Sequence, residues 1–305
     1  MAGITGIDAD DWDKRIYGPV VIPQDDGTYR LYYTGYTDNG LIWHPCMATS
    51  PDMINWTKPN LGLVDFNGST DNNILLDRLS TGPTTRLNLT DIIRAEGMYV
   101  MATFDANDTS DHVYYSADGI TGWTFGRQIF SSPSRGVHTE IKGLIFIDDV
   151  YRVYYAQHDI EGVGNRRSIG YYELNELLTG SMVDKGIIED FTSVSNDLQY
   201  YDFLPFEYAG SVWASVAFYN SDTQVLGPLG LFRNNYGGKG TSSGVWQQKG
   251  NLILNGDAGA FDEKMTTVGR PVLKDGTWKM LYTASDELHD TWPRDMFLAY
   301  ATASI

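Results

Sequence analysis

Apolar and polar residues alternate along most of the chain in short runs, which are separated by acidic or glycine-containing turns. Residues 26–34 read DGTYRLYYT, and nearly the same phrase returns as DGTWKMLYT over residues 275–283. Alternation with a period of two after an Asp-Gly turn predicts the second strand of a β-hairpin. A helical turn is expected only over residues 173–180. The pattern therefore predicts an all-β protein.

The hairpin pattern occurs five times, with weaker copies over residues 96–101, 149–155 and 208–213. One aromatic residue marks the same position in each copy: Tyr29, Tyr99, Tyr151, Trp213 and Trp278. These markers are separated by 70, 52, 62 and 65 residues. Repeats of this length, each centred on a hairpin, are typical of β-propellers. We predict a five-bladed β-propeller with blades of four antiparallel strands, forming a single domain over residues 1–305.

The two ends of the chain predict how the ring closes. Residues 297–304 resemble the third strand of the first repeat, over residues 41–49, and no fourth strand follows them. Residues 3–7, GITGI, resemble residues 119–123, GITGW, where an outer strand begins. We expect the N-terminal segment to supply the outer strand of the last blade, because this would protect an exposed sheet edge.

The composition excludes some partners. A net charge of −17 argues against nucleic acid, whose binding depends on neutralising phosphates with cations, and it disfavours an anionic membrane surface. No apolar run approaches the roughly 18–20 residues that cross a bilayer. Cys46 is the only cysteine, so no disulfide forms within the chain. The first residues do not show a signal-peptide pattern, but a signal peptide could have been removed, so the location of the protein stays open between secretion, an extracellular place and a virion surface. The oligomeric state stays open as well.

The first and last repeats resemble blades of the five-bladed propeller glycosidases, the group that holds glycoside hydrolase families 32, 43, 68 and 117. The matching phrases are WD at 12–13, GPVV at 18–21, DGTYRLYYTG at 26–35, ATSPD at 48–52, FD at 261–262 and GRPV at 269–272. The likeness covers the whole chain as a pattern and is most specific in these two repeats. It implies a hydrolase of glycosidic bonds, expected to act from the ends of an oligo- or polysaccharide.

In these glycosidases, three acidic residues lie near the starts of inner strands, around a central funnel. Counting back from each turn places Asp91 at this position in the second repeat, Glu140 in the third and Asp202 in the fourth. Arg270 takes the position in the fifth repeat. In the first repeat, Gly18 stands where the family has an aspartate. The usual nucleophile or base is therefore missing from its place.

Glycoside cleavage needs one carboxylic acid that protonates the leaving oxygen and one carboxylate that attacks or activates water. The resemblance assigns the acid to Glu140 and an auxiliary role, tuning the pKa of that acid, to Asp91. The base stays open between Asp202 and the acidic residues Asp11 and Asp13, which precede Gly18.

Structural roles are the alternatives for several of these residues. Asp91 could cap backbone amides beside a turn, and Asp13 belongs to an acidic loop that could simply be solvated. Arg270 could be a counter-ion that keeps the central acids ionised.

The loops expected around the funnel carry aromatic and short polar side chains, which suit the apolar faces and hydroxyl edges of sugars. The candidate substrate-binding residues are Arg270, His138, His158, Trp43, His289 and Arg166. The arginines would also suit an anionic sugar.

No cofactor or metal site is predicted, because the five histidines lack zinc-site spacing. Carboxylates in the funnel could hold Ca²⁺, as in some relatives, although no residue pattern requires it. We therefore predict a glycoside hydrolase acting on a carbohydrate. The alternatives are a non-catalytic carbohydrate-binding propeller, which Gly18 favours, and an adhesion module.

Overall fold

The computed structural model describes residues 4–7, 10–77, 86–107, 109–131, 139–158, 166–193, 198–234, 246–267, 269–289, 291 and 295–304. Over these ranges the protein is all-β, and its helical content is one 3₁₀ turn, Glu189–Phe191. None of the described residues form a helix long and apolar enough to span a membrane. The predicted strand-rich fold is confirmed.

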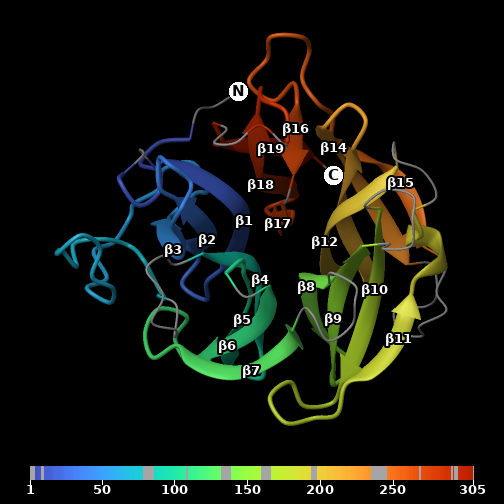
Figure 1. Ribbon diagram of the computed structural model, residues 1–305, viewed down its shortest axis with the longest axis horizontal. Helices are drawn as coiled ribbons and strands as arrows, with labels where there is room; N and C mark the ends of the chain where they lie inside the picture. Colours follow the sequence, from blue (N-terminus) through green and yellow to red (C-terminus); the bar gives the residue numbers. More distant parts are fainter. Residues whose placement is uncertain are drawn as a thin grey trace.

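The strands form antiparallel sheets that are arranged around a centre (Figure 1). The first sheet contains β1 (Arg15–Pro23), β2 (Tyr29–Tyr36) and β3 (Trp43–Ser50). The second contains β4 (Leu87–Ala95), β5 (Met98–Asp105), β6 (Ser110–Ser116) and β7 (Thr124–Ser131). The third contains β8 (Thr139–Ile147), β9 (Val150–His158), β10 (Arg167–Leu174) and β11 (Val183–Ile187).

The remaining strands belong to one eight-stranded sheet. They are β12 (Gln199–Tyr208), β13 (Ser211–Asn220), β14 (Val225–Asn234), β15 (Trp246–Ile253), β16 (Met265–Thr267), β17 (Val272–Lys274), β18 (Thr277–Ser285) and β19 (Phe297–Ser304). Among the described residues, a single parallel pair, Leu226 with Met265, links β14 to β16, and the other pairings in this sheet are antiparallel.

Tight turns join the inner strand of a repeat to its second strand. Four of these turns have two residues, both with positive φ: Glu96-Gly97, Asp148-Asp149, Ala209-Gly210 and Asp275-Gly276. Two consecutive residues of positive φ match the twist of a two-residue hairpin, which is why glycine or aspartate stands at most of these positions. The predicted hairpins are confirmed.

The hydrophobic core lies between neighbouring sheets. Between the first two sheets, Tyr32 of β2 packs in one cluster with Leu89 of β4 and Met101 of β5, and all three are buried. Between the third and fourth sheets, the rings of Tyr154 and Phe203 stack at a centroid distance of 4.5 Å. The inner strands β1, β4, β8, β12 and β17 therefore lie around the centre of the molecule, with aromatic layers packed between the sheets (Figure 1).

The N-terminal segment pairs with the first repeat. The Thr5 amide donates to the Ile54 carbonyl at 3.0 Å, and the Trp56 amide donates to the Thr5 carbonyl at 2.9 Å. A Cβ on Gly6 would lie 1.7 Å from the Trp56 carbonyl oxygen, so only glycine permits this approach. The expectation that this segment pairs as the outer strand of the last blade is wrong, because among the described strands β19 pairs only with β18. Its isoleucines do pack on a cluster that includes Leu281 of β18.

A buried histidine makes the stability of the fold depend on pH. His44 of β3 is 3% exposed, and neither ring nitrogen has a hydrogen-bond partner among the described residues. Burial lowers the pKa of His44 to about 4, although Asp77 opposes the shift. An unfolded histidine has a pKa near 6.5, so the unfolded chain binds this proton first as the pH falls.

We expect the free energy of unfolding to fall by about 3 kcal/mol between pH 7 and pH 4 through His44 alone. Urea denaturation at several pH values would measure it. The matched variant His44→Phe keeps an aromatic ring without a titrating group, so its stability should fall less over this window. Equal losses in the two proteins would contradict the prediction.

Candidate active site

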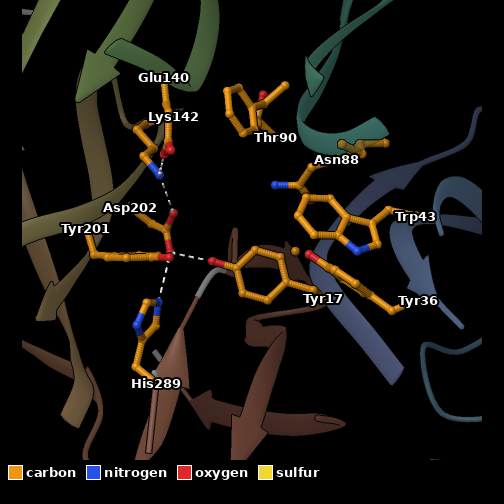
Figure 2. A pocket seen from close by; sticks show the side chains of 13 residues that line it. Tyr17, Tyr36, Trp43, Asn88, Thr90, Glu140, Lys142, Tyr201, Asp202 and His289 are labelled. Atoms are coloured by element: carbon orange, nitrogen blue, oxygen red, sulfur yellow. Dashed lines mark hydrogen bonds and ion pairs between the residues drawn. The ribbon is translucent and has the colours of Figure 1, made fainter. Parts of the chain in front are cut away.

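A cavity of about 460 Å³ opens at the centre of the molecule, at the end where the inner strands begin. A second cavity, of about 420 Å³, lies where the same strands end. The first cavity combines carboxylate, ammonium and aromatic side chains, whereas the lining of the second is mostly apolar. The first cavity is therefore the candidate active site (Figure 2).

A β-bulge in each of the inner strands β1, β4, β8 and β12 turns a residue toward this cavity. The pairing with the second strand skips Gly18 and Pro19 in β1, Thr90 in β4, Lys142 in β8 and Tyr201 in β12. Apart from Pro19, all of these residues line the cavity. A bulge inserts an unpaired residue and re-aims the side chains beside it. The bulges therefore bring Gly18, Thr90, Lys142 and Tyr201 to the site.

Lys142 joins the two carboxylates found among the described lining residues. Its Nζ is 2.6 Å from Oε2 of Glu140 and 3.6 Å from Oδ1 of Asp202 (Figure 2). The Lys142 side chain is 7% exposed and that of Glu140 is 20% exposed, so solvent reaches the carboxylate more easily. Burial lowers the pKa of Lys142, but the two carboxylates outweigh burial and hold it above its ordinary value. The ammonium therefore keeps its charge.

Asp202 is oriented by hydroxyl groups on its other oxygen. The Tyr17 hydroxyl donates to Oδ2 at 3.3 Å, and the Thr267 hydroxyl donates to the same atom. Tyr17 comes from β1 and Thr267 from β16, so groups from three parts of the ring meet at one carboxylate. This leaves Asp202 with a defined orientation at the cavity wall.

Aromatic side chains complete the cavity. The Tyr201 hydroxyl is 2.7 Å from Nε2 of His289, and the Lys142 ammonium is 4.7 Å from the centre of the Tyr201 ring. Burial raises the pKa of Tyr201, although nearby cations oppose the shift, so the hydroxyl keeps its proton. Figure 2 shows Tyr36 and Trp43 across the cavity from Glu140 and Asp202. The site thus has an ionic side and an aromatic side.

Trp43 is fixed by a backbone contact. Its indole Nε1 donates to the Gly40 carbonyl at 2.7 Å, and its ring lies 5.1 Å from that of Tyr36. The Arg86 guanidinium lies over the ring, 5.7 Å from its centre, and the part of the indole that lines the cavity adds an apolar surface.

Asp91 and Arg270 lie away from the candidate site and bind each other. Nη2 of Arg270 is 2.8 and 2.7 Å from the two Asp91 oxygens. The amides of Ile92 and Leu144 also donate to this carboxylate, each at 2.7 Å. Asp91 is fully buried, and burial raises its pKa although Arg270 opposes the shift. The pair ties β4 to β8 and to the segment before β17, so its geometry fits a structural role.

Asp13 is also buried outside the cavity. Its carboxylate accepts hydrogen bonds from the Tyr33 hydroxyl at 2.7 Å and from the Asp10 amide at 2.9 Å, and it pairs with Lys58 at 2.7 Å. Asp11 is exposed and pairs with Lys14. Neither aspartate lines the candidate site.

The structure brings together only some of the candidate residues. Glu140, Asp202, Trp43 and His289 line the cavity, as does Gly18. Asp91, Asp13, Arg270, His158 and Arg166 do not line it, and His138 lies outside the described residues. Sequence reasoning missed Lys142, Tyr17, Tyr201, Asn88 and Thr90. Tyr17 and Tyr201 stand next to the singled-out Gly18 and Asp202, which was the available signal.

The ionic side of the cavity already holds a cation. Lys142 places an ammonium between Glu140 and Asp202, so these carboxylates already have a positive partner. Among the described residues, no group of three His, Cys, Asp or Glu side chains could hold a metal ion.

No protein-family model matches the sequence, and no curated protein matches it. Solved structures do resemble it, at low identity. A glycoside hydrolase superposes with a TM-score of 0.70 at 12% identity, covering 99% of this chain and 90% of its own. A thermostable family-43 glycoside hydrolase gives a TM-score of 0.64 at 12% identity, over 93% of this chain and 88% of its own.

A third structure is CoXyl43, a family-43 β-xylosidase/α-arabinofuranosidase from a compost microbial metagenome, in complex with xylotriose. It gives a TM-score of 0.61 at 12% identity and covers 94% of this chain and 91% of its own. Identities this low establish the fold alone. The chain therefore shares the fold of these solved glycoside hydrolases.

Proposed function

We propose that this protein hydrolyses a glycosidic bond of an oligo- or polysaccharide in the cavity at the start of the inner strands. One observation carries the proposal: Glu140 and Asp202 enter the same cavity from neighbouring inner strands, opposite aromatic rings. Glycoside hydrolysis needs such a pair, one group to protonate the leaving oxygen and one to attack or to activate water. The fold of the solved glycoside hydrolases supports the same conclusion.

The two carboxylates differ in a way that suggests their roles. Glu140 is the more exposed and is bonded to Lys142, so it can turn toward a bound sugar and act as the general acid. Asp202 is held by hydroxyls and is the candidate nucleophile or base. When Glu140 is protonated, Lys142 remains paired with Asp202.

The aromatic side would hold the sugar. The ring faces of Tyr36 and Trp43 suit the apolar face of a pyranose or furanose, and the Tyr201–His289 pair offers polar groups to its hydroxyls. This assignment keeps Trp43 and His289 as substrate-binding candidates and adds Tyr36 and Tyr201.

A second candidate function is sugar binding without hydrolysis. Two observations favour it: Gly18 lines the cavity where the family resemblance expects a carboxylate, and Lys142 pairs with both of the carboxylates that are present. A carboxylate bound to an ammonium is a poor general acid, because the ion pair favours its charged form.

A hydrolysis screen tests the proposal. Purified protein would be incubated with a panel of aryl-glycosides and plant and marine polysaccharides, and the same protein would be applied to a glycan array. Release of sugar would support the hydrolase. Binding on the array without release from any substrate would support the second candidate. Neither release nor binding would overturn both.

For the architecture, we propose five blades in one domain of 305 residues. The first three sheets would be three blades, and the eight-stranded sheet would be two, β12–β15 and β16–β19, since one residue pair joins these groups. A crystal structure showing five repeats around one axis would support this count. Calorimetry should give a single unfolding transition, and two separate transitions would contradict the single domain.

A further inference from the structure

Threonine hydroxyls hold two inner strands to the repeat that comes before them. Thr34 of β2 accepts a hydrogen bond from the Leu89 amide of β4 at 2.8 Å and donates to Oδ1 of Asn88 at 2.8 Å. Thr283 of β18 likewise accepts from the Gly18 amide of β1, at 3.2 Å. Thr34 therefore does two things: it satisfies an unpaired amide of the next inner strand, and it orients the side chain just before that amide.

Glu140 occupies in the third repeat the place that Asn88 occupies in the second. Leu89 is the last paired residue before the bulge in β4, and Ile141 is the last paired residue before the bulge in β8. Asn88 and Glu140 each precede that residue by one position, and both line the cavity. By analogy with Thr34, a partner in the third repeat should accept a hydrogen bond from the Ile141 amide and donate one to the Glu140 side chain.

A carboxyl group replaces the hydroxyl at this junction. The counterpart of Thr34 is Thr103 of β5, because each pairs with the last residue before a bulge, yet the Thr103 hydroxyl has no partner among the described residues. The Ile141 amide donates instead to Oδ1 of Asp111, in β6, at 2.9 Å. Asp111 therefore makes the first of the two contacts that Thr34 makes.

Asp111 retains a second oxygen for the other contact. The residue is fully buried, and its Oδ2 has no hydrogen-bond partner among the described residues. Burial raises the pKa of Asp111 well above its ordinary value, and the charge of Glu140 adds to this, against the Ile141 amide and Lys142. A threonine hydroxyl would accept from the Ile141 amide equally well, and burying a carboxyl group costs more free energy than burying a hydroxyl. The second carboxyl oxygen is therefore expected to have a function.

We propose that Asp111 is a neutral carboxylic acid that positions Glu140, with Oδ1 holding the Ile141 amide and the Oδ2 hydroxyl donating a hydrogen bond to the Glu140 carboxylate. The inference rests on the proposed role of Glu140 as the general acid. In that role, the proton passes from Glu140 to the leaving oxygen, and Asp111 keeps its own proton. Its hydrogen bond then stabilises the carboxylate that Glu140 becomes, because a donor favours the charged form.

Other charges around Glu140 act on the same equilibrium. They are the charges of Lys142 on β8 itself and Asp202 on β12, with the titratable hydroxyl of Tyr201 beside them. A test must therefore change Asp111 and leave these groups in place.

Titration of ¹³C-labelled side-chain carboxyls by NMR provides such a test and does not need turnover. The Glu140 resonance is identified by its absence in Glu140→Gln and the Asp111 resonance by its absence in Asp111→Asn. We expect Asp111 to stay protonated through pH 7. Asp111→Asn keeps an acceptor and a donor, so its Glu140 midpoint should lie within about 0.5 pH unit of the wild-type midpoint. Asp111→Val has neither group, so its Glu140 midpoint should lie about one pH unit above that of the wild type.

An Asp111 that titrates near pH 4, or a Glu140 midpoint that is the same in Asp111→Val as in wild type, would overturn the proposal. The wild-type titration decides the state of Asp111 even if the valine variant does not fold. Where hydrolysis is found, Asp111→Val should lower kcat about tenfold and Asp111→Asn should retain it. The expected titrations without hydrolysis by any of these proteins would refute the proposed function and leave the role of Asp111 standing.

Discussion

Replacing Glu140 with glutamine is expected to lower kcat by about 10²–10⁴-fold and to leave sugar binding nearly unchanged. Glutamine has the shape of the glutamic acid but cannot give a proton to the leaving oxygen. Lys142 keeps Asp202 as a partner in the variant, at 3.6 Å, so its ammonium is not left unpaired. Hydrolysis rates on the substrate found in the screen, together with calorimetric titration of the sugar, would measure both quantities.

Glu207 supplies a matched control for this experiment. It is an exposed glutamate of β12, the same strand as Asp202, but it lines the second cavity at the other end of the inner strands. Glu207→Gln should therefore keep full activity. Full activity in Glu140→Gln would show that the acid is misassigned, and loss of activity in Glu207→Gln would move the chemistry to the second cavity.

Replacing Asp91 with alanine is expected to lower the free energy of unfolding by about 3–5 kcal/mol. The substitution removes both oxygens that bind Arg270, whose side chain is only 13% exposed, and leaves its guanidinium without a counter-ion. The buried Ile92 and Leu144 amides lose their acceptor as well. Urea denaturation of the variant and the wild type would measure the difference.

Two further variants separate this explanation from a general sensitivity to lost charge. Asp25 pairs with Arg94 at 2.9 Å on the exposed surface, so Asp25→Ala should cost less than about 1 kcal/mol. Combining Asp91→Leu with Arg270→Met removes both charges and should recover the part of the loss that comes from the unpaired guanidinium, while the Ile92 and Leu144 amides stay without their acceptor. Wild-type stability in Asp91→Ala would contradict the structural role.

Local features of the chain predicted most of the fold. The hairpins were predictable because a turn such as Asp275-Gly276 and the alternation beside it are determined by neighbours in the sequence. The pairing of the N-terminal segment was not, because similarity between residues 3–7 and 119–123 does not show which edge the segment meets. Its place depends on the close approach of Gly6 to Trp56, a contact between residues 50 positions apart.

The candidate site was predictable only in part. Counting back from the turns led to Glu140 and Asp202, which line the cavity, and by the same count to Asp91, which binds Arg270 instead. The bulges do not explain the difference, because Asp91 and Asp202 each directly follow the unpaired residue of their strand. The difference lies in their partners, since Asp91 binds Arg270 whereas Asp202 accepts from Thr267. Lys142 reaches the site through such a bulge, and no local sequence signal distinguishes it from a surface lysine.

The sequence by itself determined the all-β class, the repeated hairpins and the presence of acidic and aromatic residues near the starts of the inner strands. These depend on side-chain alternation and turn conformation, which act over a few residues. Only the tertiary structure decided which of the buried acids meet the cavity, because burial and partners come from other repeats: Arg270 neutralises Asp91, and Lys58 neutralises Asp13. A carboxylate becomes a site or a structural anchor according to the charge that the fold places beside it.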